Sequence, residues 1–264
     1  MRVRAAAAGL AAACTVITGG AAIAGCGAAV GDHAAKPAGP GTAGAPAASR
    51  QATAASSPAR SPLPSRRPRG PASRRPGRQL ITVTASSYGS TYAVFTAYTA
   101  APGGGGWRTA LGPWTARLGN GGLAPPGQKR EGDGRTPSGT YGFGFFFGVQ
   151  PDPGVSFPYR QSQPYDVWDD DPSSPRYNEW ADDRYQDPGA NPEPMYVSGY
   201  DYGAVIAYNT ARTPGLGSAI FLHVNIGRAT TGCVTLPEDK LLAVLRWLRP
   251  SDSPRIRLAV SGTG

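Results

Sequence analysis

Outside its first 78 residues the chain contains one cysteine, Cys233, and one histidine, His223, ten residues apart. A thiolate attacks carbonyl carbon readily, but a free thiol is largely protonated at neutral pH, so a nearby imidazole that takes the proton creates a nucleophile. Of the other cysteines, Cys14 lies in an apolar leader and Cys26 directly follows it, so Cys233 has no intramolecular disulfide partner. The pair indicates thiol catalysis, and the alternative is an inert core cysteine beside a hydrogen-bonded histidine.

The elements that must position this pair are a strand and a short loop. Residues 218–225 alternate like a strand, with Ile220, Leu222 and Val224 on one face and Phe221, His223 and Asn225 on the other. A short polar return over residues 226–231 then leads to Gly232, which lets the backbone bend sharply before Cys233 and aim amide groups at a developing oxyanion. A second strand after the loop would bring the imidazole and the thiol into contact.

Several motifs occur in order around this pair. His223 is followed by Thr230-Thr231-Gly232-Cys233-Val234, and upstream lie the run of residues 134–141, the segment Trp168-Asp169-Asp170 and the pair Tyr177-Asn178. Together they resemble the catalytic domain of the L,D-transpeptidase (YkuD-like) family over residues 79–260. The resemblance implies a mainly β fold, a YkuD-like β-sandwich with one helix on the C-terminal side of the catalytic cysteine.

The resemblance also implies a reaction. The family's cysteine attacks the bond after the third residue of a peptidoglycan stem peptide, and the acyl-enzyme then passes to an amine of a neighbouring stem. Applied to this sequence, the resemblance implies that Cys233 is the nucleophile and His223 is its base. It also implies that the amides of Gly232 and Cys233 contribute to the oxyanion hole. The carbonyl of Val224 or Asn225 is expected to orient the second ring nitrogen of the histidine.

The motif departs from the family pattern at three points. Thr231 stands where most members have a second histidine, the interval from histidine to cysteine is shorter, and Val234-Thr235 replaces an Arg or Asn. An L,D-carboxypeptidase, in which water takes the acyl group, and a catalytically silent wall-binding module therefore stay open as alternatives. A sortase is disfavoured, because its histidine and cysteine lie far apart in sequence and an arginine follows the cysteine.

Candidate substrate-binding residues are Arg228, Asn225, Thr231, Trp168 and Tyr177. The two aromatic residues belong to a Pro-rich segment, residues 150–196, with ten acidic residues and three arginines. This segment is too long for a simple connection. It predicts either a lid or acceptor-side wall that attracts a cationic amine, or simply a solvated loop.

Periodicity places the other elements. Strands are predicted at residues 79–86 and 91–99, joined by a turn at Tyr88-Gly89, and at residues 114–118, 140–147, 204–208 and 255–260. A helix is predicted after the cysteine. Pro237, Glu238 and Asp239 suit its first turn and Arg246 and Arg249 its last, and its apolar face is Leu241, Leu242, Leu245 and Leu248.

Charge is unevenly distributed along the chain. The formal net charge is +9, but residues 79–264 hold 15 basic and 16 acidic groups, so the basic excess belongs to the first 78 residues. A near-neutral domain argues against nucleic acid as a partner, because DNA- and RNA-binding surfaces are basic. The sequence contains no zinc-ligand cluster or phosphate loop, so neither a metal nor a cofactor is indicated. It indicates no oligomeric state.

The N-terminal part predicts export. Residues 1–25 have a basic start and an apolar stretch that ends at Cys26, which resembles a bacterial lipobox with Cys26 as the lipidated residue. An uncleaved signal anchor or ordinary secretion is the alternative. Residues 26–78, rich in Ala, Pro and Arg, predict a disordered tether, either a spacer or a contact for anionic polymers. The expected product is a catalytic domain, residues 79–264, lipid-anchored outside the cell membrane and facing the cell wall.

Overall fold

The computed structural model describes residues 77–262 of the chain. The predicted signal of residues 1–25, the lipidation site Cys26 and nearly all of the tether of residues 26–78 therefore lie outside the described residues. Among the described residues, no helix is both long enough and apolar enough to cross a membrane.

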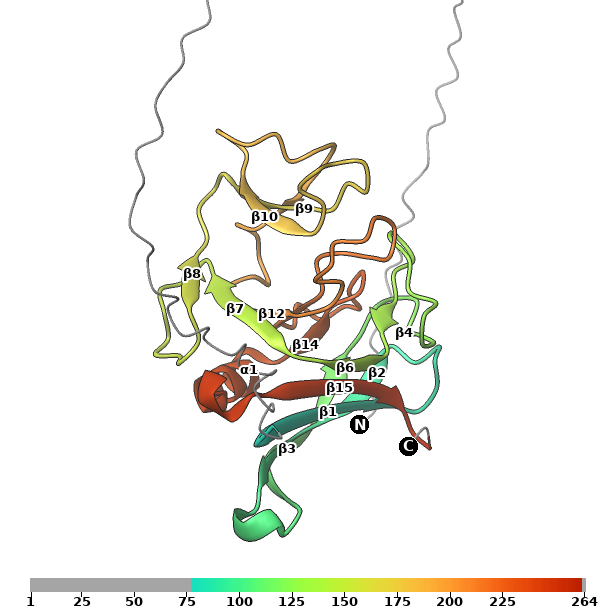
Figure 1. Cartoon of the computed structure of the whole chain (residues 1–264), viewed down its shortest axis with the longest axis vertical. Helices are drawn as coiled ribbons and strands as arrows, with labels where there is room; N and C mark the ends of the chain where they lie inside the picture. The colour runs from blue at the N-terminus through green and yellow to red at the C-terminus, as the bar shows by residue number, and fades with distance from the viewer. Residues whose placement is uncertain (1–76, 263–264) are drawn as a thin grey trace, which may run out of the picture. The chain divides into compact units, whose positions relative to one another are not determined.

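A ten-stranded sheet forms most of the domain (Figure 1), in the order β6-β15-β1-β2-β3-β14-β13-β12-β7-β8. Its strands are β1 (Gln79–Ala85), β2 (Tyr92–Ala100), β3 (Trp107–Arg117), β6 (Gly139–Tyr141), β7 (Phe143–Gly148), β8 (Tyr159–Gln161), β12 (Gly203–Ile206), β13 (Phe221–Val224), β14 (Val234–Leu236) and β15 (Arg255–Val260). Smaller elements are β4 (Leu123–Ala124), which pairs with β5 (Thr136–Pro137), and the 3-10 helices Pro102–Gly104 and Pro250–Asp252.

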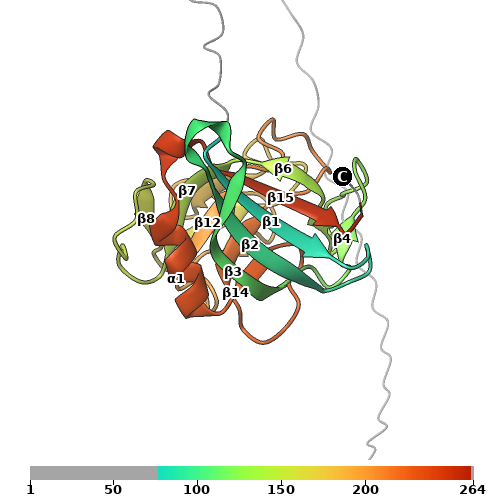
Figure 2. The same ribbon diagram turned by 90° about the horizontal axis from the view of Figure 1, so that it is seen from below.

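The sheet curls on itself. β6 and β7 are separated only by Gly142, yet β6 lies at one edge of the sheet and β7 next to the other edge. Figure 2 shows this curl, with β1, β2 and β15 in front of β7 and β12. The enclosed core includes Ile81, Phe95, Phe146 and Leu222, all fully buried. The predicted mainly β fold with one helix after the cysteine is confirmed.

The predicted hairpin is also confirmed. β1 pairs antiparallel with β2, and inward-facing Ile81, Val83 and Ala85 alternate with half-buried residues, as a strand with one covered face requires. β1 also pairs in parallel with β15, so the first and last strands of the domain are neighbours in the sheet.

Three predicted strands have different limits in the structure. The strand predicted at residues 114–118 is the end of the longer β3, and the one predicted at residues 140–147 is divided at Gly142 into β6 and β7. The strand predicted at residues 218–225 begins only at Phe221, because Ala219 has a φ of +50°, outside the extended region.

The predicted helix is α1 (Glu238–Trp247), which lies against β12, β13 and β14. Leu241, Val244 and Leu245 form its buried face, whereas Leu242 is half-buried. The helix begins after Pro237 and ends before Leu248, whose extended backbone leads toward Pro250. Pro237 is thus the N-cap and not part of the first turn.

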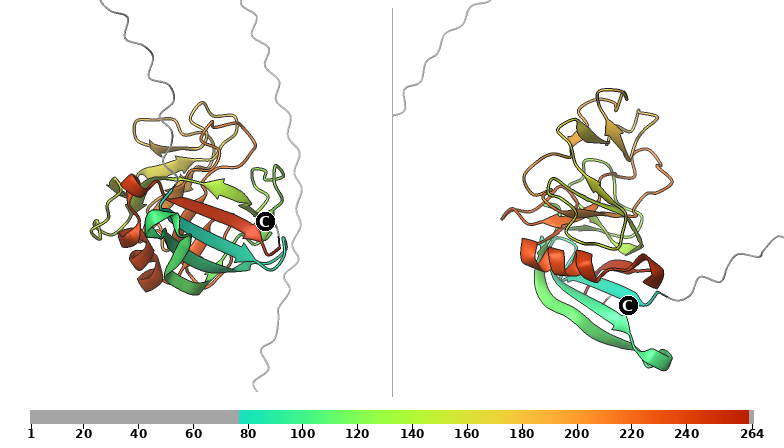
Figure 3. Two further views of the ribbon diagram at one scale, coloured as in Figure 1. Left: turned by 60° about the horizontal axis from the view of Figure 1, so that its bottom comes forward. Right: turned by 90° about the vertical axis from the view of Figure 1, so that its left-hand side faces the viewer.

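The acidic segment contains a second sheet. Within residues 150–196, β8 joins the main sheet, and β9 (Asp166–Asp169) pairs with both β10 (Glu179–Asp182) and β11 (Glu193–Pro194). This small sheet lies at the opposite end of the domain from the β1–β3 region (Figures 1 and 3). It is attached by an aromatic cluster in which Trp168 packs against Phe221 at 5.0 Å between ring centroids and against Phe145 at 6.4 Å.

Candidate active site

Parallel pairing of β13 with β14 brings the cysteine beside the histidine strand. Leu222 pairs with Val234 and His223 with Thr235, so Cys233, just before β14, lies next to Phe221. The Phe221 amide donates a hydrogen bond to Cys233 Sγ at 3.3 Å, and the thiol donates to the Ala219 carbonyl at 3.3 Å. The thiol is thus held on the same side of the strand pair as the imidazole, with its proton directed toward Ala219.

Two threonines fix the backbone of Cys233. Thr230 Oγ1 donates to the Cys233 carbonyl at 2.8 Å and accepts a hydrogen bond from the Gly232 amide at 3.1 Å. Thr136 Oγ1 donates to the same carbonyl at 3.4 Å. The upstream motif that contains Thr136 therefore supports the cysteine loop directly.

A side chain at position 232 would be crowded. A Cβ atom there would lie 3.1 Å from a methyl group of Ile220 and 3.2 Å from the Arg135 carbonyl, closer than ordinary van der Waals contact. In this resting arrangement the Gly232 amide donates its hydrogen bond to Thr230 Oγ1. If that amide serves the predicted oxyanion hole, it exchanges this partner for the substrate oxygen.

His223 is held in one orientation by two neighbours. Its Nδ1 lies 3.1 Å from the Gly199 carbonyl, and its ring meets the Tyr200 ring edge-on at 4.9 Å between centroids. Because a carbonyl only accepts, Nδ1 carries the proton, and Nε2 is left to accept one. The Gly199 carbonyl supplies this hydrogen bond, and the predicted Asn225 carbonyl does not. The backbone of Val224 also acts to raise the pKa of the imidazole, but less than Gly199 does.

Burial keeps both groups neutral. Desolvation lowers the pKa of His223 to about 4, against the opposing effect of the Gly199 carbonyl. Burial, with the nearby charge of Glu193, raises the pKa of the Cys233 thiol well above its ordinary value, although the Phe221 amide and Lys129 act in the opposite direction. The resting pair is a thiol and a neutral imidazole, so the sulfur has to lose its proton as it attacks.

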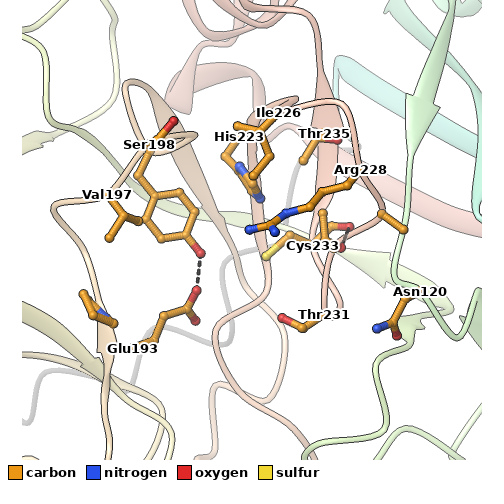
Figure 4. Close-up of a pocket in the computed structure, with 14 residues that line it drawn as sticks. Asn120, Glu193, Val197, Ser198, His223, Ile226, Arg228, Thr231, Cys233 and Thr235 are labelled. Carbon is orange, nitrogen blue, oxygen red and sulfur yellow. Dashed lines mark hydrogen bonds between the residues drawn. The ribbon is translucent and has the colours of Figure 1, made fainter. Parts of the chain in front are cut away.

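The pair lies in a pocket of about 520 Å³ (Figure 4). Cys233 and His223 share its wall with Arg228, whose guanidinium points toward both of them. The other lining residues come from β11, β14 and three loops: Asn120, Glu193, Pro194, Val197, Ser198, Tyr200, Ile226, Ala229, Thr230, Thr231 and Thr235.

The predicted substrate-binding residues divide into two groups. Arg228 and Thr231 are exposed and line the pocket. Asn225 does not line it; its side chain accepts a hydrogen bond from the Gly227 amide at 2.8 Å and shapes the turn. Trp168 and Tyr177 are buried behind the wall, where Trp168 Nε1 donates to Asn178 at 3.0 Å and the Tyr177 hydroxyl accepts from the Gly217 amide at 3.0 Å.

Four residues that shape the site have no counterpart in the sequence predictions: Gly199, which orients the histidine, and the pocket-lining residues Tyr200, Glu193 and Thr235. Thr235 is 1% exposed, and its Oγ1 has no hydrogen-bond partner among the described residues. None of the four belongs to a short motif, so a list of chemically reactive residue types gives no signal for them. Within residues 77–262, no group of three or more His, Cys, Asp or Glu side chains is arranged to hold a metal ion.

Comparison with known proteins adds one finding. The family model described as the L,D-transpeptidase catalytic domain matches residues 103–257, a range that contains both Cys233 and His223. No curated protein and no solved structure matches the chain.

Proposed function

The chain belongs to the L,D-transpeptidase catalytic domain family, and from this membership we propose that it is a peptidoglycan L,D-transpeptidase with Cys233 as nucleophile and His223 as base. Membership implies a function on peptidoglycan. The observation that carries the finer proposal is the pocket itself, in which a buried thiol and an imidazole with its Nε2 available lie on paired strands.

The first half-reaction forms a thioester. As the substrate carbonyl enters, the Cys233 thiol turns from Ala219 toward His223, the imidazole takes its proton, and sulfur attacks the carbonyl carbon. The protonated imidazole then gives that proton to the departing amine of the terminal residue. A neutral histidine has a free Nε2 to receive the thiol proton in the first step, and because burial disfavours the imidazolium, it releases that proton readily in the second.

The second half-reaction transfers the acyl group to an amine of another stem peptide. His223 returns a proton to the sulfur as the thioester breaks and the new amide forms. Thr235 Oγ1, buried in the pocket wall, is a hydrogen-bonding group that substrate can satisfy.

The test uses the full chain and Cys233→Ala, each incubated with a disaccharide-tetrapeptide, with and without a second stem peptide, and products are weighed by mass spectrometry. We expect a crosslinked product from the wild type only. Loss of the terminal residue without transfer would instead indicate the carboxypeptidase. No product that depends on Cys233, from a chain with a normal unfolding transition, would contradict both activities and favour the wall-binding module.

Arg228 is proposed to bind a substrate carboxylate. It is exposed in the pocket beside Cys233, and no ion pair or hydrogen bond engages its guanidinium within the part of the chain that the structure describes. Replacement by glutamine should raise KM for the tetrapeptide about 10- to 100-fold with little change in kcat, since a hydrogen bond to a charged group contributes roughly 1.5 to 3 kcal/mol.

A matched control for this prediction is Arg246→Gln on the exposed face of α1, where the guanidinium donates a hydrogen bond to the Pro153 carbonyl. That variant should leave KM unchanged. An Arg228→Gln enzyme with wild-type KM would remove Arg228 from the binding site.

The proposed location is outside the cytoplasm, anchored through Cys26, where the substrate lies. The apolar leader that ends at Cys26 supports it. An acylated Cys26 at the N-terminus of the mature chain is the expected result of intact-mass measurement, and an unmodified or uncleaved N-terminus would contradict it.

A further inference from the structure

A second cavity adjoins the pocket of Cys233. It has a volume of about 330 Å³ and shares the lining residues Asn120, Glu193 and Thr231 with the first pocket. In Figure 4 all three lie below Cys233, with Thr231 between Glu193 and Asn120. The second cavity is also lined by Ala219, whose carbonyl accepts the hydrogen bond of the thiol. It therefore approaches the nucleophile from a different side than the first pocket.

This cavity is lined by four carboxylates and one lysine. Lys129 Nζ lies 2.7 Å from Asp133, so these two charges offset each other. Glu131, Asp170 and Glu193 remain without a lysine or arginine partner within 4 Å among the described residues. A cavity whose carboxylates outnumber its cationic side chains in this way attracts a cation.

Glu193 connects the cavity to the reacting sulfur. The Tyr200 hydroxyl donates a hydrogen bond to Glu193 Oε1, marked by the dashed line in Figure 4. Tyr200 is 5% exposed and belongs to the same buried cluster as Cys233. Glu193, Tyr200 and Cys233 also line the same pocket, so the Glu193 carboxyl borders the space in which the acylated sulfur would react.

The surroundings of Glu193 adjust its proton affinity. Burial raises the pKa of Glu193 to about 7, the hydrogen bond from Tyr200 opposes this, and the charges of Asp170 and Glu131 add to it. The other ionisable groups that face it are Cys233 and, around the same two cavities, Lys129, Asp133, His223 and Arg228. A carboxyl group that titrates near neutral pH is suited to act as a general base.

The second half-reaction needs such a base. An alkylamine acceptor reaches the site mainly as an ammonium ion, since amines of this type have a pKa near 10. To form an amide it has to lose two protons. One returns to the sulfur of Cys233 through His223, and the other requires a separate acceptor. With Thr231 at the position of the family's second histidine, no second imidazole is available.

We propose that Glu193 is a further catalytic residue that removes the first proton from the acceptor ammonium as it enters through the acidic cavity. The free amine then attacks the thioester carbonyl, the bond from carbon to Cys233 Sγ breaks, and the second proton passes through His223 to the sulfur. Glu193 afterwards releases its proton to water. This inference rests on the proposed transpeptidase function.

The test compares Glu193→Gln with wild type and with the matched control Glu238→Gln, which changes an exposed carboxylate in the first turn of α1. The full chain is first acylated with the tetrapeptide, and decay of the acyl-enzyme is followed by intact mass with two acceptors. One is a second stem peptide, which carries an ammonium ion. The other is methoxyamine, which is already neutral at pH 7.

Glu193→Gln should slow transfer to the stem peptide about 10²-fold or more, the usual contribution of a general base. Acylation and transfer to methoxyamine should change less than about threefold. The rise of wild-type transfer rate with pH, centred near pH 7, should be lost in the variant. Glu238→Gln should match wild type throughout.

Equal losses with both acceptors, or in acylation and transfer alike, would overturn the inference and leave Glu193 a structural partner of Tyr200. An unchanged rate with the stem peptide would overturn it too. If wild type does not react with methoxyamine, the ratio of the rate of transfer to the stem peptide to the rate of acylation is compared between Glu193→Gln and wild type. An equal ratio in the two proteins would overturn the inference. A wild-type chain that forms no acyl-enzyme would instead contradict the proposed function.

Discussion

Replacement of Cys233 by serine should lower the rate of acyl-enzyme formation at pH 7 by at least about 10³-fold. A hydroxyl group has a far higher pKa than a thiol, and burial already makes ionisation at this position unfavourable. His223, whose pKa burial lowers to about 4, is too weak a base to activate a hydroxyl group. The measurement is intact-mass detection of the acyl-enzyme in single turnover with the tetrapeptide.

The serine variant is a strict test because it keeps the local hydrogen bonds. A hydroxyl can accept from the Phe221 amide and donate to the Ala219 carbonyl as the thiol does. We expect its free energy of unfolding to stay within about 1 to 2 kcal/mol of wild type. A correctly folded serine variant that acylates within tenfold of wild type would show that Cys233 is not the nucleophile.

The pairing of Cys233 with His223, the proposed nucleophile and base, could be predicted because its signals are local in sequence. Residue counts leave one thiol and one imidazole, and alternation across residues 220–224 places His223 on the face opposite Leu222. Parallel pairing of the two short strands then completes the site. The hairpin of β1 and β2 and the helix α1 were predictable for the same reason, since their periodic patterns lie within single elements.

The remaining parts of the site depend on contacts between distant segments. The Gly199 carbonyl that orients His223 lies 24 residues before it, and no sequence pattern identifies one loop carbonyl among many. Glu193 was one of ten acidic residues in its segment, and only the fold separates it from the solvated ones. The small sheet of β9, β10 and β11 was missed because strands of two to four residues give too short an alternation to recognise.

A buried neutral histidine and a buried carboxyl group with a raised pKa change the pH dependence of stability in opposite directions. His223 has a folded pKa of about 4 against 6.5 ordinarily, so between these values the unfolded chain binds more protons and stability rises with pH. Glu193 has a folded pKa of about 7 against 4.5, so the folded chain holds the extra proton and stability falls as pH rises. Asp170, with its pKa raised to about 6, mainly by burial, acts in the same direction as Glu193. Because two carboxyl groups oppose one histidine, the free energy of unfolding of the wild type should fall as pH rises from about 4.5 to 6.5.

Replacement of His223 by glutamine should expose the carboxyl contribution. The stabilisation from the neutral imidazole is complete above pH 6.5 and is lost as pH falls toward 4, and a shift of this size corresponds to about 3 kcal/mol. Without it, the free energy of unfolding should fall between pH 4.5 and 6.5 by about 2 to 3 kcal/mol more than in wild type. Urea denaturation of the full chain at half-unit pH intervals measures this difference.

Glu193→Gln provides the control of opposite sign. It removes one of the two carboxyl groups that stabilise the folded chain at low pH, so its free energy of unfolding should fall less steeply with pH than that of wild type, over the interval in which that of His223→Gln falls more steeply. A constant loss of stability in either variant does not affect this comparison of slopes. Parallel curves for His223→Gln and wild type would show that folding does not lower the pKa of His223 and would contradict this prediction.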